Sequence, residues 1–182
     1  MAYAVTLLFN ADLNKAIGSC WRRLADAGLS RSMLDLGYQP HVTLAIYDTL
    51  DVDAAVASLD LVFSDARPID AELSNVATFG AGSGVCYATQ ALSADLMRLH
   101  ARTLGAIGGT CRPHYQSGHW TPHCTLATDL SDPALIHVID FLGRDWRPSA
   151  GTFERAELVQ FTPVIALKRW TFRPVRPATR MP

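Results

Sequence analysis

The chain has 182 residues, which is about the size of one globular domain, and 49 % of them are apolar. Charged residues make up 18 % and leave a net charge of −1, which argues against disorder and against general binding of duplex DNA. We expect no secretory signal, because residues 1–5 have no basic region and no long apolar stretch follows. We also expect no membrane-crossing segment, because no run approaches the roughly 20 apolar residues that a bilayer requires. The four cysteines form no Cys-x-x-Cys pair, so we expect reduced core thiols in a cytoplasmic protein.

The charge is distributed unevenly along the chain. Five basic and no acidic side chains occur in residues 168–182, namely Lys168, Arg169, Arg173, Arg176 and Arg180. Two interpretations stay open for this segment: a solvated terminal strand and tail, or an edge that attracts RNA or phosphate.

The first half of the chain predicts alternating strands and helices. The expected order is strand, helix, strand, helix and strand, over residues 3–9, 13–29, 38–45, 54–63 and 69–79. The strands are rich in β-branched and aromatic residues. The first helix has apolar residues at helical spacing, and Gly28 stands where it would stop. The second helix follows an acidic start at residues 48–53.

The second half repeats this order after a glycine-rich turn at residues 80–84. Its expected elements are strand, helix, strand, helix, strand and a last strand, over residues 85–91, 92–104, 120–127, 134–142, 152–162 and 166–175. Gly108 stands where the first of these helices would stop. Pro133 suits the first turn of the second helix, because its missing N–H has no partner there.

A repeated motif is the strongest sign of duplication. Residues 38–45 (YQPHVTLA) recur as residues 120–127 (WTPHCTLA) at an offset of 82, with five of eight positions identical. Repeats of this kind indicate that the two halves form equivalent units.

The order of elements predicts an α+β fold. The hairpin expected at residues 80–84 argues against a purely parallel sheet. We predict one domain over residues 1–182 with two pseudo-symmetric lobes, from about residues 1–80 and 85–182. Each lobe would be a small, mainly antiparallel sheet backed by helices on the outside, with a central cleft between the lobes.

The motif strands are expected to present polar side chains on one face. Successive residues of a strand point to opposite faces, so His41, Thr43 and Ala45 would share one face. The apolar residues at 42, 44 and 46 would pack on the other face. The second motif would repeat this arrangement with His123 and Thr125. If the lobes face each other, two imidazoles and two hydroxyls converge on one cavity.

These groups suit in-line chemistry at a phosphodiester. Histidine has an unperturbed pKa of about 6.5, so one imidazole can take a proton from the nucleophile while the other protonates the leaving group. Threonine hydroxyls can donate hydrogen bonds to the non-bridging oxygens of the phosphate. No metal ion or other cofactor is required.

The paired Pro-His-x-Thr-Leu-Ala strings, their spacing and the order of elements over most of the chain resemble the two-histidine (2H) phosphoesterase superfamily, specifically its 2′-5′ RNA ligase-like branch. The resemblance implies two pseudo-symmetric lobes around a cleft that both motifs line. It also implies metal-independent hydrolysis or formation of 2′-linked phosphodiesters, often from 2′,3′-cyclic phosphates of RNA ends or small nucleotides.

The resemblance also implies roles for the motif residues. His41 and His123 would be the catalytic pair, and Thr43 and Thr125 would bind the phosphate. His123 would activate water, and His41 would protonate the leaving oxygen, which gives a 2′-phosphate. The same site could join RNA ends through a 2′-5′ link, and the two roles exchange when the reaction runs backwards.

Further side chains near the motifs are candidates for substrate contact. A nucleotide base often stacks on an aromatic ring, and Tyr38, Phe79, Tyr115 and Trp120 lie close in sequence to a motif or to the central turn. Arg112 could contact phosphate. A purely structural role is the competing interpretation for each of these side chains.

Two other functions stay open. The cleft could belong to a nucleotide- or RNA-binding module with negligible catalysis, although a pure binder needs no pair of proton-transfer groups. A zinc hydrolase could use His114, His119 and His123. Pro122 disfavours a helix there, however, and no His-Glu-x-x-His string occurs. No protein partner is implied.

Overall fold

Seven strands, five α-helices and one 3₁₀ helix form within residues 1–174, which are the residues that the computed structural model describes. The strands are β1 (Ala2–Phe9), β2 (His41–Tyr47), β3 (Ile69–Thr78), β4 (Cys86–Gln90), β5 (His123–Ala127), β6 (Ser149–Phe161) and β7 (Ile165–Thr171). The helices are α1 (Ala11–Asp26), α2 (Ser32–Asp35), α3 (Val52–Phe63), α4 (Ala94–Ala106) and α5 (Asp132–Asp145), and the 3₁₀ helix is η1 (Pro113–Tyr115). The α+β class predicted from the sequence is confirmed.

The helix ends follow local chemistry that the sequence indicated. The first helix ends earlier than its apolar pattern suggests, because Gly28 adopts a left-handed backbone with a φ of 69°. Asp51 begins α3 by accepting a hydrogen bond from the backbone of Ala54 at 3.1 Å, and Ser93 begins α4 in the same way. The four-residue helix α2 was not predicted, since it is too short to show a helical period.

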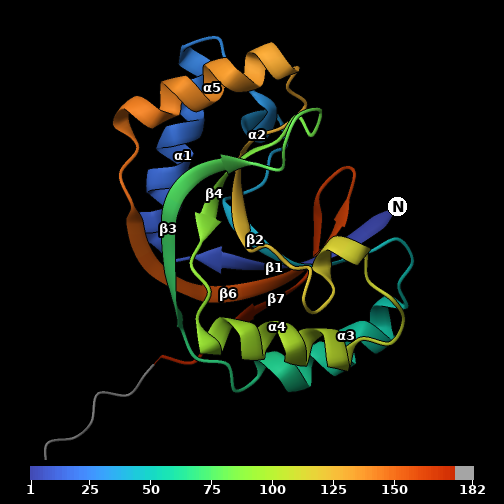
Figure 1. Cartoon of the computed structure of the whole chain (residues 1–182). Helices are drawn as coiled ribbons and strands as arrows, with labels where there is room; N and C mark the ends of the chain where they lie inside the picture. Colours follow the sequence, from blue (N-terminus) through green and yellow to red (C-terminus); the bar gives the residue numbers. More distant parts are fainter. Residues whose placement is uncertain (175–182) are drawn as a thin grey trace, which may run out of the picture.

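The strands form one antiparallel sheet in the described part of the chain. Its order is β2-β1-β6-β3-β4-β5, with β7 paired to β6. The long strand β6 pairs with β3 through residues 149–153 and with β1 from Phe153 onward. The structure therefore joins the two small sheets expected from the sequence into one. Figure 1 shows β3 and β6 as long, curved strands that connect the two ends of the molecule.

Each lobe takes one strand from the other half of the sequence. β1, which pairs with β2, also pairs with β6 of the second half, whereas β4, which pairs with β5, also pairs with β3 of the first half. The units β2-β1-β6 and β5-β4-β3 are equivalent and meet where β6 pairs with β3. The lobes consequently differ from the contiguous halves, residues 1–80 and 85–182, that the motif spacing suggests. The motif strands β2 and β5 lie at the two ends of this strand order.

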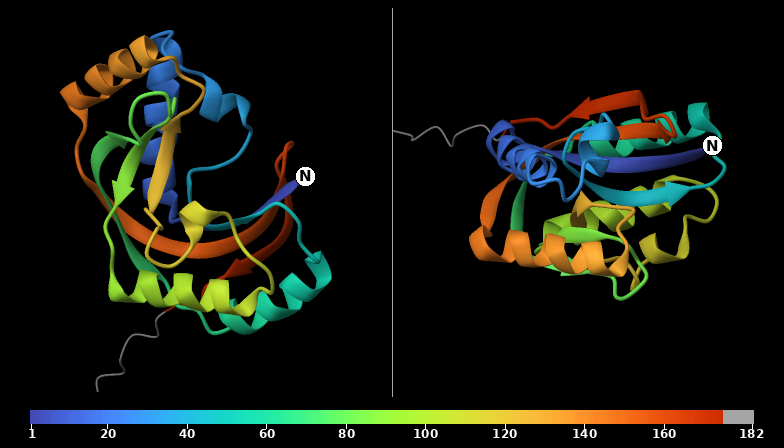
Figure 2. Two further views of the ribbon diagram at one scale, coloured as in Figure 1. Left: turned by 45° about the vertical axis from the view of Figure 1, so that its right-hand side comes forward. Right: turned by 90° about the horizontal axis from the view of Figure 1, so that it is seen from above.

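The helices gather in two pairs at opposite ends of the curved sheet. α1 and α5 lie side by side at one end, and α3 and α4 at the other (Figures 1 and 2). An ion pair of 2.7 Å between Arg23 and Asp145 joins α1 to α5. Each pair therefore combines one helix from each half of the sequence.

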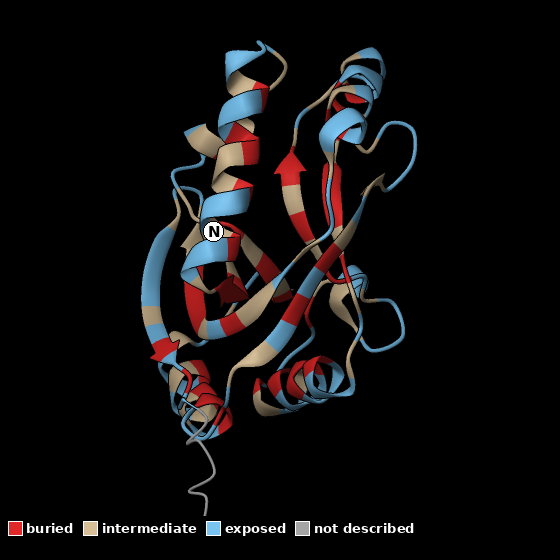
Figure 3. Cartoon of the chain, turned by 90° about the vertical axis from the view of Figure 1, so that its left-hand side faces the viewer, coloured by how far each residue is buried: buried red, intermediate tan, exposed pale blue. Residues whose placement is uncertain are grey.

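Buried apolar residues of the strands and of the helices form one core cluster, and Figure 3 marks the buried positions along both kinds of element. The rings of Phe9 and Phe153 stack with centroids 4.9 Å apart, where β1 meets β6. The four cysteines are free and buried, as expected from their spacing. Burial raises the pKa of Cys20 to about 11, so this thiol is protonated at neutral pH. In residues 1–174, no helix has the length and apolar character of a membrane span.

Three of the basic residues near the C-terminal end form ion pairs. Arg173 lies 3.1 Å from Asp65, and Lys168 lies 3.6 Å from Asp60. Arg169 pairs with a glutamate of β6. Val175, the expected end of the last strand, and the basic residues Arg176 and Arg180 lie outside the described residues.

Two of the glycines in the turn between β3 and β4 have different constraints. Gly82 and Gly84 have positive φ angles of 76° and 63°. A Cβ on Gly84 would lie 2.8 Å from the carbonyl oxygen of Leu130, whereas a Cβ on Gly82 would meet no described atom within 4 Å. Gly84 also accepts a hydrogen bond of 3.1 Å from the backbone of Leu130, so the turn packs against the segment that leads into α5.

We predict that G84A lowers the free energy of unfolding by about 2–3 kcal/mol, because it adds a clash to the strain of a left-handed backbone. The matched variant G82A adds the backbone strain alone and should cost about 1 kcal/mol. Urea denaturation of both variants measures the difference. Equal losses would contradict the close approach at Leu130.

Candidate active site

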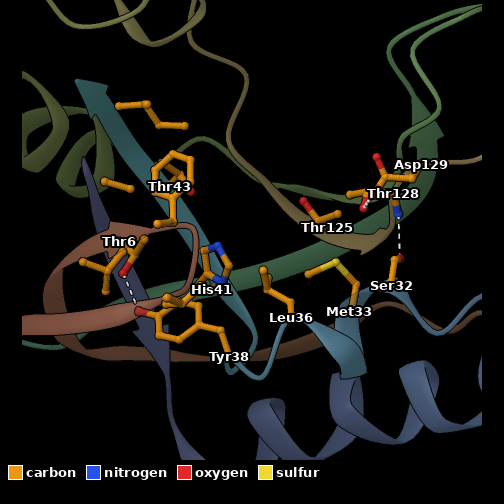
Figure 4. A pocket seen from close by; sticks show the side chains of 15 residues that line it. Thr6, Ser32, Met33, Leu36, Tyr38, His41, Thr43, Thr125, Thr128 and Asp129 are labelled. Carbon is orange, nitrogen blue, oxygen red and sulfur yellow. Dashed lines mark hydrogen bonds between the residues drawn. The ribbon is translucent and has the colours of Figure 1, made fainter. Parts of the chain in front are cut away.

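Two adjoining cavities lie between the motif strands. The first cavity has a volume of about 350 Å³ and is lined by His41 and Thr43, and we call it the His41 cavity. The second has a volume of about 600 Å³ and is lined by His123, and we call it the His123 cavity. Thr125 and Ile46 line both cavities, so the two together form one cleft. Figure 4 shows His41, Thr43 and Thr125 around the first cavity.

A β-bulge in β2 decides which motif side chains reach the cleft. Thr43 pairs with Thr6 of β1, while Ala45 pairs with the adjacent Val5, so β2 carries one extra residue, Leu44. A bulge of this kind reverses the faces that the following side chains occupy.

The bulge corrects the faces expected from strict alternation. His41 and Thr43 share a face as predicted, but Ala45 is buried in the core. Ile46, which we expected on the opposite face, lines the cleft instead. The sequence gives no sign of this change, because Leu44 and Ala45 are apolar residues that suit either face.

The second motif strand has the same bulge at the equivalent position. Leu126 is the extra residue between Thr125 and Ala127. Ala127 is buried, and Thr128, the counterpart of Ile46, lines the cleft. The duplication therefore extends from the motif residues to the local geometry of the backbone.

Both imidazoles are held through the same ring nitrogen. Nδ1 of His41 lies 2.9 Å from the carbonyl oxygen of Gln39, and Nδ1 of His123 lies 2.7 Å from that of Thr121. A carbonyl oxygen can only accept a hydrogen bond, so Nδ1 donates in both rings. The Nε2 atoms are thereby left to exchange protons with a bound molecule.

Burial lowers the pKa of both His41 and His123 below the ordinary value of 6.5. The backbone carbonyl beside each ring opposes this effect, because it stabilises the protonated form. The positive charge of His123 lowers the pKa of His41 further, and the carboxylate of Glu157 raises it. The two rings are therefore close enough for a proton on one to disfavour a proton on the other.

Three of the four predicted aromatic contacts lie at the cleft. Tyr38 lines the His41 cavity, and its ring centroid is 4.8 Å from that of His41. Phe79 and Tyr115 line the His123 cavity. Phe79 is 50 % exposed and meets His123 edge-on, with 5.0 Å between the ring centroids. These rings are placed where a planar group of a ligand could stack.

Trp120 is described by the structure but is not among the residues that line the two cavities. Its position therefore does not support the predicted contact with substrate. Its ring stacks on His100 of α4, with centroids 4.0 Å apart, and Nε1 donates to the carbonyl oxygen of Thr43 at 2.9 Å. Trp21 of α1 donates in the same way to Thr125, at 3.1 Å. The two indoles thus satisfy backbone acceptors of the motif strands, which lie at the ends of the sheet.

Arg112 lines the His123 cavity, but its guanidinium is already paired. Nη2 and Nε lie 2.6 Å and 3.0 Å from Oδ1 of Asp48. These hydrogen bonds hold the pKa of Asp48 below its usual range. The backbone N–H of Arg112 also donates to Ile46 at 2.8 Å, so the residue ties the segment before η1 to the end of β2.

The histidines considered as zinc ligands line one cavity without forming a metal site. His114 and His119 line the His123 cavity together with His123. Within residues 1–174, no group of three or more histidine, cysteine, aspartate or glutamate side chains is arranged to hold a metal ion. The structure thus gives no support to the zinc interpretation.

The sequence did not indicate several of the residues that line the cleft or pack beside it. The apolar walls of the His41 cavity include Met33, Leu36, Val159, Phe161 and Val164. Asp129 lines the same cavity from a left-handed backbone with a φ of 59°. Tyr87 packs against His123 with 5.0 Å between the ring centroids. These residues come from segments without a motif, and only the folded chain brings them to the cleft.

Comparison with known proteins gives two kinds of match. The sequence profile of the 2′-5′ RNA ligase superfamily matches residues 11–163. Among solved structures, TT0787 of Thermus thermophilus has a TM-score of 0.65 at 14 % identity and covers 97 % of this chain and 100 % of its own. E. coli LigT in its apo form has a TM-score of 0.63 at 18 % identity, with 94 % of this chain and 98 % of its own covered. A comparison with curated proteins found no match.

The pseudo-symmetric α+β fold, with a His-x-Thr motif on each of two strands beside one cleft, is that of the 2H phosphoesterases. This chain belongs to the 2′-5′ RNA ligase superfamily, because the profile match spans most of its length. The resemblance predicted from the paired motifs is confirmed. At these identities, the likeness to the solved structures shows the shared fold alone.

We predict that H123A raises the pKa of His41, because the variant removes a neighbouring positive charge. NMR titration of the imidazole resonances measures this change. H137A, which removes an exposed histidine from α5, is the control and should leave the pKa of His41 unchanged. A pKa of His41 that does not respond to H123A would mean that the two rings do not share the cleft.

Proposed function

We propose that the protein is a metal-independent phosphodiesterase that opens 2′,3′-cyclic phosphates of RNA ends or small nucleotides and leaves a 2′-phosphate. The observation that carries the proposal is the pair of imidazoles beside one cleft, each with Nδ1 bound to a backbone carbonyl. With this arrangement, one imidazole can take a proton from the nucleophile, and the other can give a proton to the leaving oxygen of a phosphate held between the motifs.

The proposed reaction follows the roles that the family resemblance implies. A water oxygen attacks phosphorus in line with the bond to O3′, and Nε2 of His123 takes a proton from the water. Nε2 of His41 gives a proton to O3′ as the P–O3′ bond breaks. One P–O bond forms, one breaks, and the phosphate stays on O2′. Solvent then removes the proton from His123 and returns one to His41.

The threonines would hold the phosphate during this exchange. Thr43 and Thr125 are half-buried, line the His41 cavity and precede the bulged leucines of their strands. Their hydroxyls can donate to the non-bridging oxygens, and hydrogen bonds to a charged oxygen are stronger than those between neutral groups. We propose that they stabilise the negative charge in the transition state.

The cleft has room for a small nucleotide. E. coli LigT has been crystallised with 3′-AMP, with ATP and with NADP⁺. We extend nucleotide binding to this chain, because the His41 cavity combines apolar walls with the ring of Tyr38. A 5′-hydroxyl of an RNA end in place of water would give a 2′-5′ link by the same proton transfers.

We predict that the protein hydrolyses 2′,3′-cyclic nucleotides in the presence of EDTA. Chromatography of the 2′-phosphate product measures this turnover. H41A and H123A should each lower kcat by at least roughly 100-fold, because each removes one proton-transfer group. H137A is the matched control and should retain activity. Loss of activity in EDTA would favour a metal-dependent hydrolase, and tight nucleotide binding without product would favour a binding module.

We also predict a bell-shaped pH profile of kcat/KM with its maximum below pH 6.5. Activity falls at low pH because the base becomes protonated, and at high pH because the acid loses its proton. Burial lowers the pKa of both imidazoles, so both limbs shift to lower pH than an exposed histidine pair would give. A maximum well above pH 7 would contradict this account of the pair.

We predict that T43V and T125V each lower kcat/KM by roughly 10- to 100-fold, which corresponds to the loss of one hydrogen bond to a charged oxygen. The shape of the pH profile should stay the same, since both imidazoles remain. Steady-state kinetics of the two variants tests this. A kcat/KM equal to that of the wild type would exclude the hydroxyls from phosphate binding.

A further inference from the structure

We infer that Glu157 and Tyr38 are positioning residues that make His41 the proton donor of the cleft. They would thereby set the direction of proton transfer between two histidines that the duplication makes otherwise equivalent. The inference rests on the proposed function, because it concerns the acid and base of that reaction.

A buried network lies behind His41. Glu157 of β6 is 0 % exposed, and its Oε2 accepts a hydrogen bond of 2.6 Å from the hydroxyl of Tyr38. Arg169 of β7 pairs with the other carboxylate oxygen. Thr6 of β1 lies 2.9 Å from the hydroxyl of Tyr38, whose ring packs against His41. Three strands therefore hold the ring that contacts the imidazole.

The hydroxyl of Tyr38 stays protonated in this network. Burial raises its pKa, and the hydrogen bond to Glu157 raises it further. The phenol is therefore a permanent donor to the carboxylate, and Thr6 donates to the phenol oxygen in turn. Such a chain of hydrogen bonds fixes the orientation of the ring beside His41.

The charge of the network favours a proton on His41. The carboxylate of Glu157 raises the pKa of His41 and so opposes the effect of burial. Arg169 is 52 % exposed, so water screens its positive charge more than it screens the buried carboxylate. Asp129 also lines this cavity, but it follows β5 and lies beside Thr125 and Thr128, across the cavity from His41 (Figure 4).

The strand registers identify the counterpart of Glu157 in the other lobe. Glu157 pairs with Thr6, which pairs with the motif threonine of β2. Ala77 of β3 pairs with Tyr87, which pairs with the motif threonine of β5. The methyl group of Ala77 therefore occupies the position in the second lobe that corresponds to the buried carboxylate of Glu157 in the first.

His123 has correspondingly different surroundings. The rings of Phe79 and Tyr87 contact it, each with 5.0 Å between the ring centroids. The titratable groups that line its cavity are basic or phenolic ones: Arg112, His114, Tyr115 and His119. Nothing in this set stabilises a positive charge as Glu157 does, so only the His41 side of the cleft has a buried carboxylate behind its imidazole. In the proposed reaction this carboxylate supports the protonated form of His41, which is the acid, and His123 acts as the base.

The test compares a leaving group that needs an acid with one that does not. The first substrate is adenosine 2′,3′-cyclic phosphate, whose O3′ must gain a proton as it leaves. The second is 3′-deoxyadenosine 2′-(4-nitrophenyl phosphate), from which 4-nitrophenolate leaves as a stable anion. In both reactions water adds to phosphorus and the phosphate stays on O2′, so only the need for the acid differs.

The variants are E157Q and Y38F, which keep the shapes of the side chains, with H41A and H123A as references. We expect E157Q and Y38F to lower kcat/KM about tenfold for the cyclic phosphate and less than about twofold for the aryl ester. H123A should lower both. In E157Q the alkaline limb of the pH profile should move to lower pH, because the pKa of His41 falls when the negative charge of Glu157 is removed.

Equal losses on the two substrates, or a larger loss on the aryl ester, would overturn the inference. Wild-type protein that hydrolyses neither substrate would instead contradict the proposed function. If E157Q does not fold, as judged by circular dichroism, Y38F decides the question, because it removes a single oxygen. If the protein does not hydrolyse the aryl ester, the pH profile on the cyclic phosphate decides the question. An alkaline limb that lies at the same pH in E157Q as in the wild type would overturn the inference.

Discussion

The exchange of β3 and β6 between the lobes is the constraint on which the rest of the structure depends. Each lobe completes its three strands with one from the other half of the sequence, and the two exchanged strands pair with each other. The lobes therefore cannot separate without breaking backbone hydrogen bonds of the sheet. This rigid connection fixes the motif strands relative to each other, and the indoles of Trp21 and Trp120 bond to the carbonyl groups beside the cleft.

The duplication gives the cleft its symmetry, and the side chains around it remove that symmetry. The two halves share a bulge after the motif threonine and a carbonyl group bound to Nδ1. A reaction with distinct acid and base roles needs the two imidazoles to differ. The difference arises outside the motifs, since a buried carboxylate on β6 corresponds to the methyl group of Ala77 on β3.

The sequence predicted the order of the strands and longer helices, and it predicted the motif histidines and threonines that line the cleft, because a repeated motif and an alternating pattern are local signals. It did not predict the strand exchange, because register between distant strands leaves no mark on either strand alone. It also missed the turn of Ile46 toward the cleft, since two apolar neighbours hide a bulge. Glu157 lies in the middle of a long strand, and only the pairing with Thr6 brings its carboxylate to Tyr38.

The most direct test of the central claim is a crystal structure of the protein with a nucleoside 2′-phosphate bound. The account predicts that the phosphate lies between the lobes, with Nε2 of both His41 and His123 within hydrogen-bond distance of its oxygens and the hydroxyls of Thr43 and Thr125 beside them. A phosphate bound by one motif alone, or at another surface, would contradict the account.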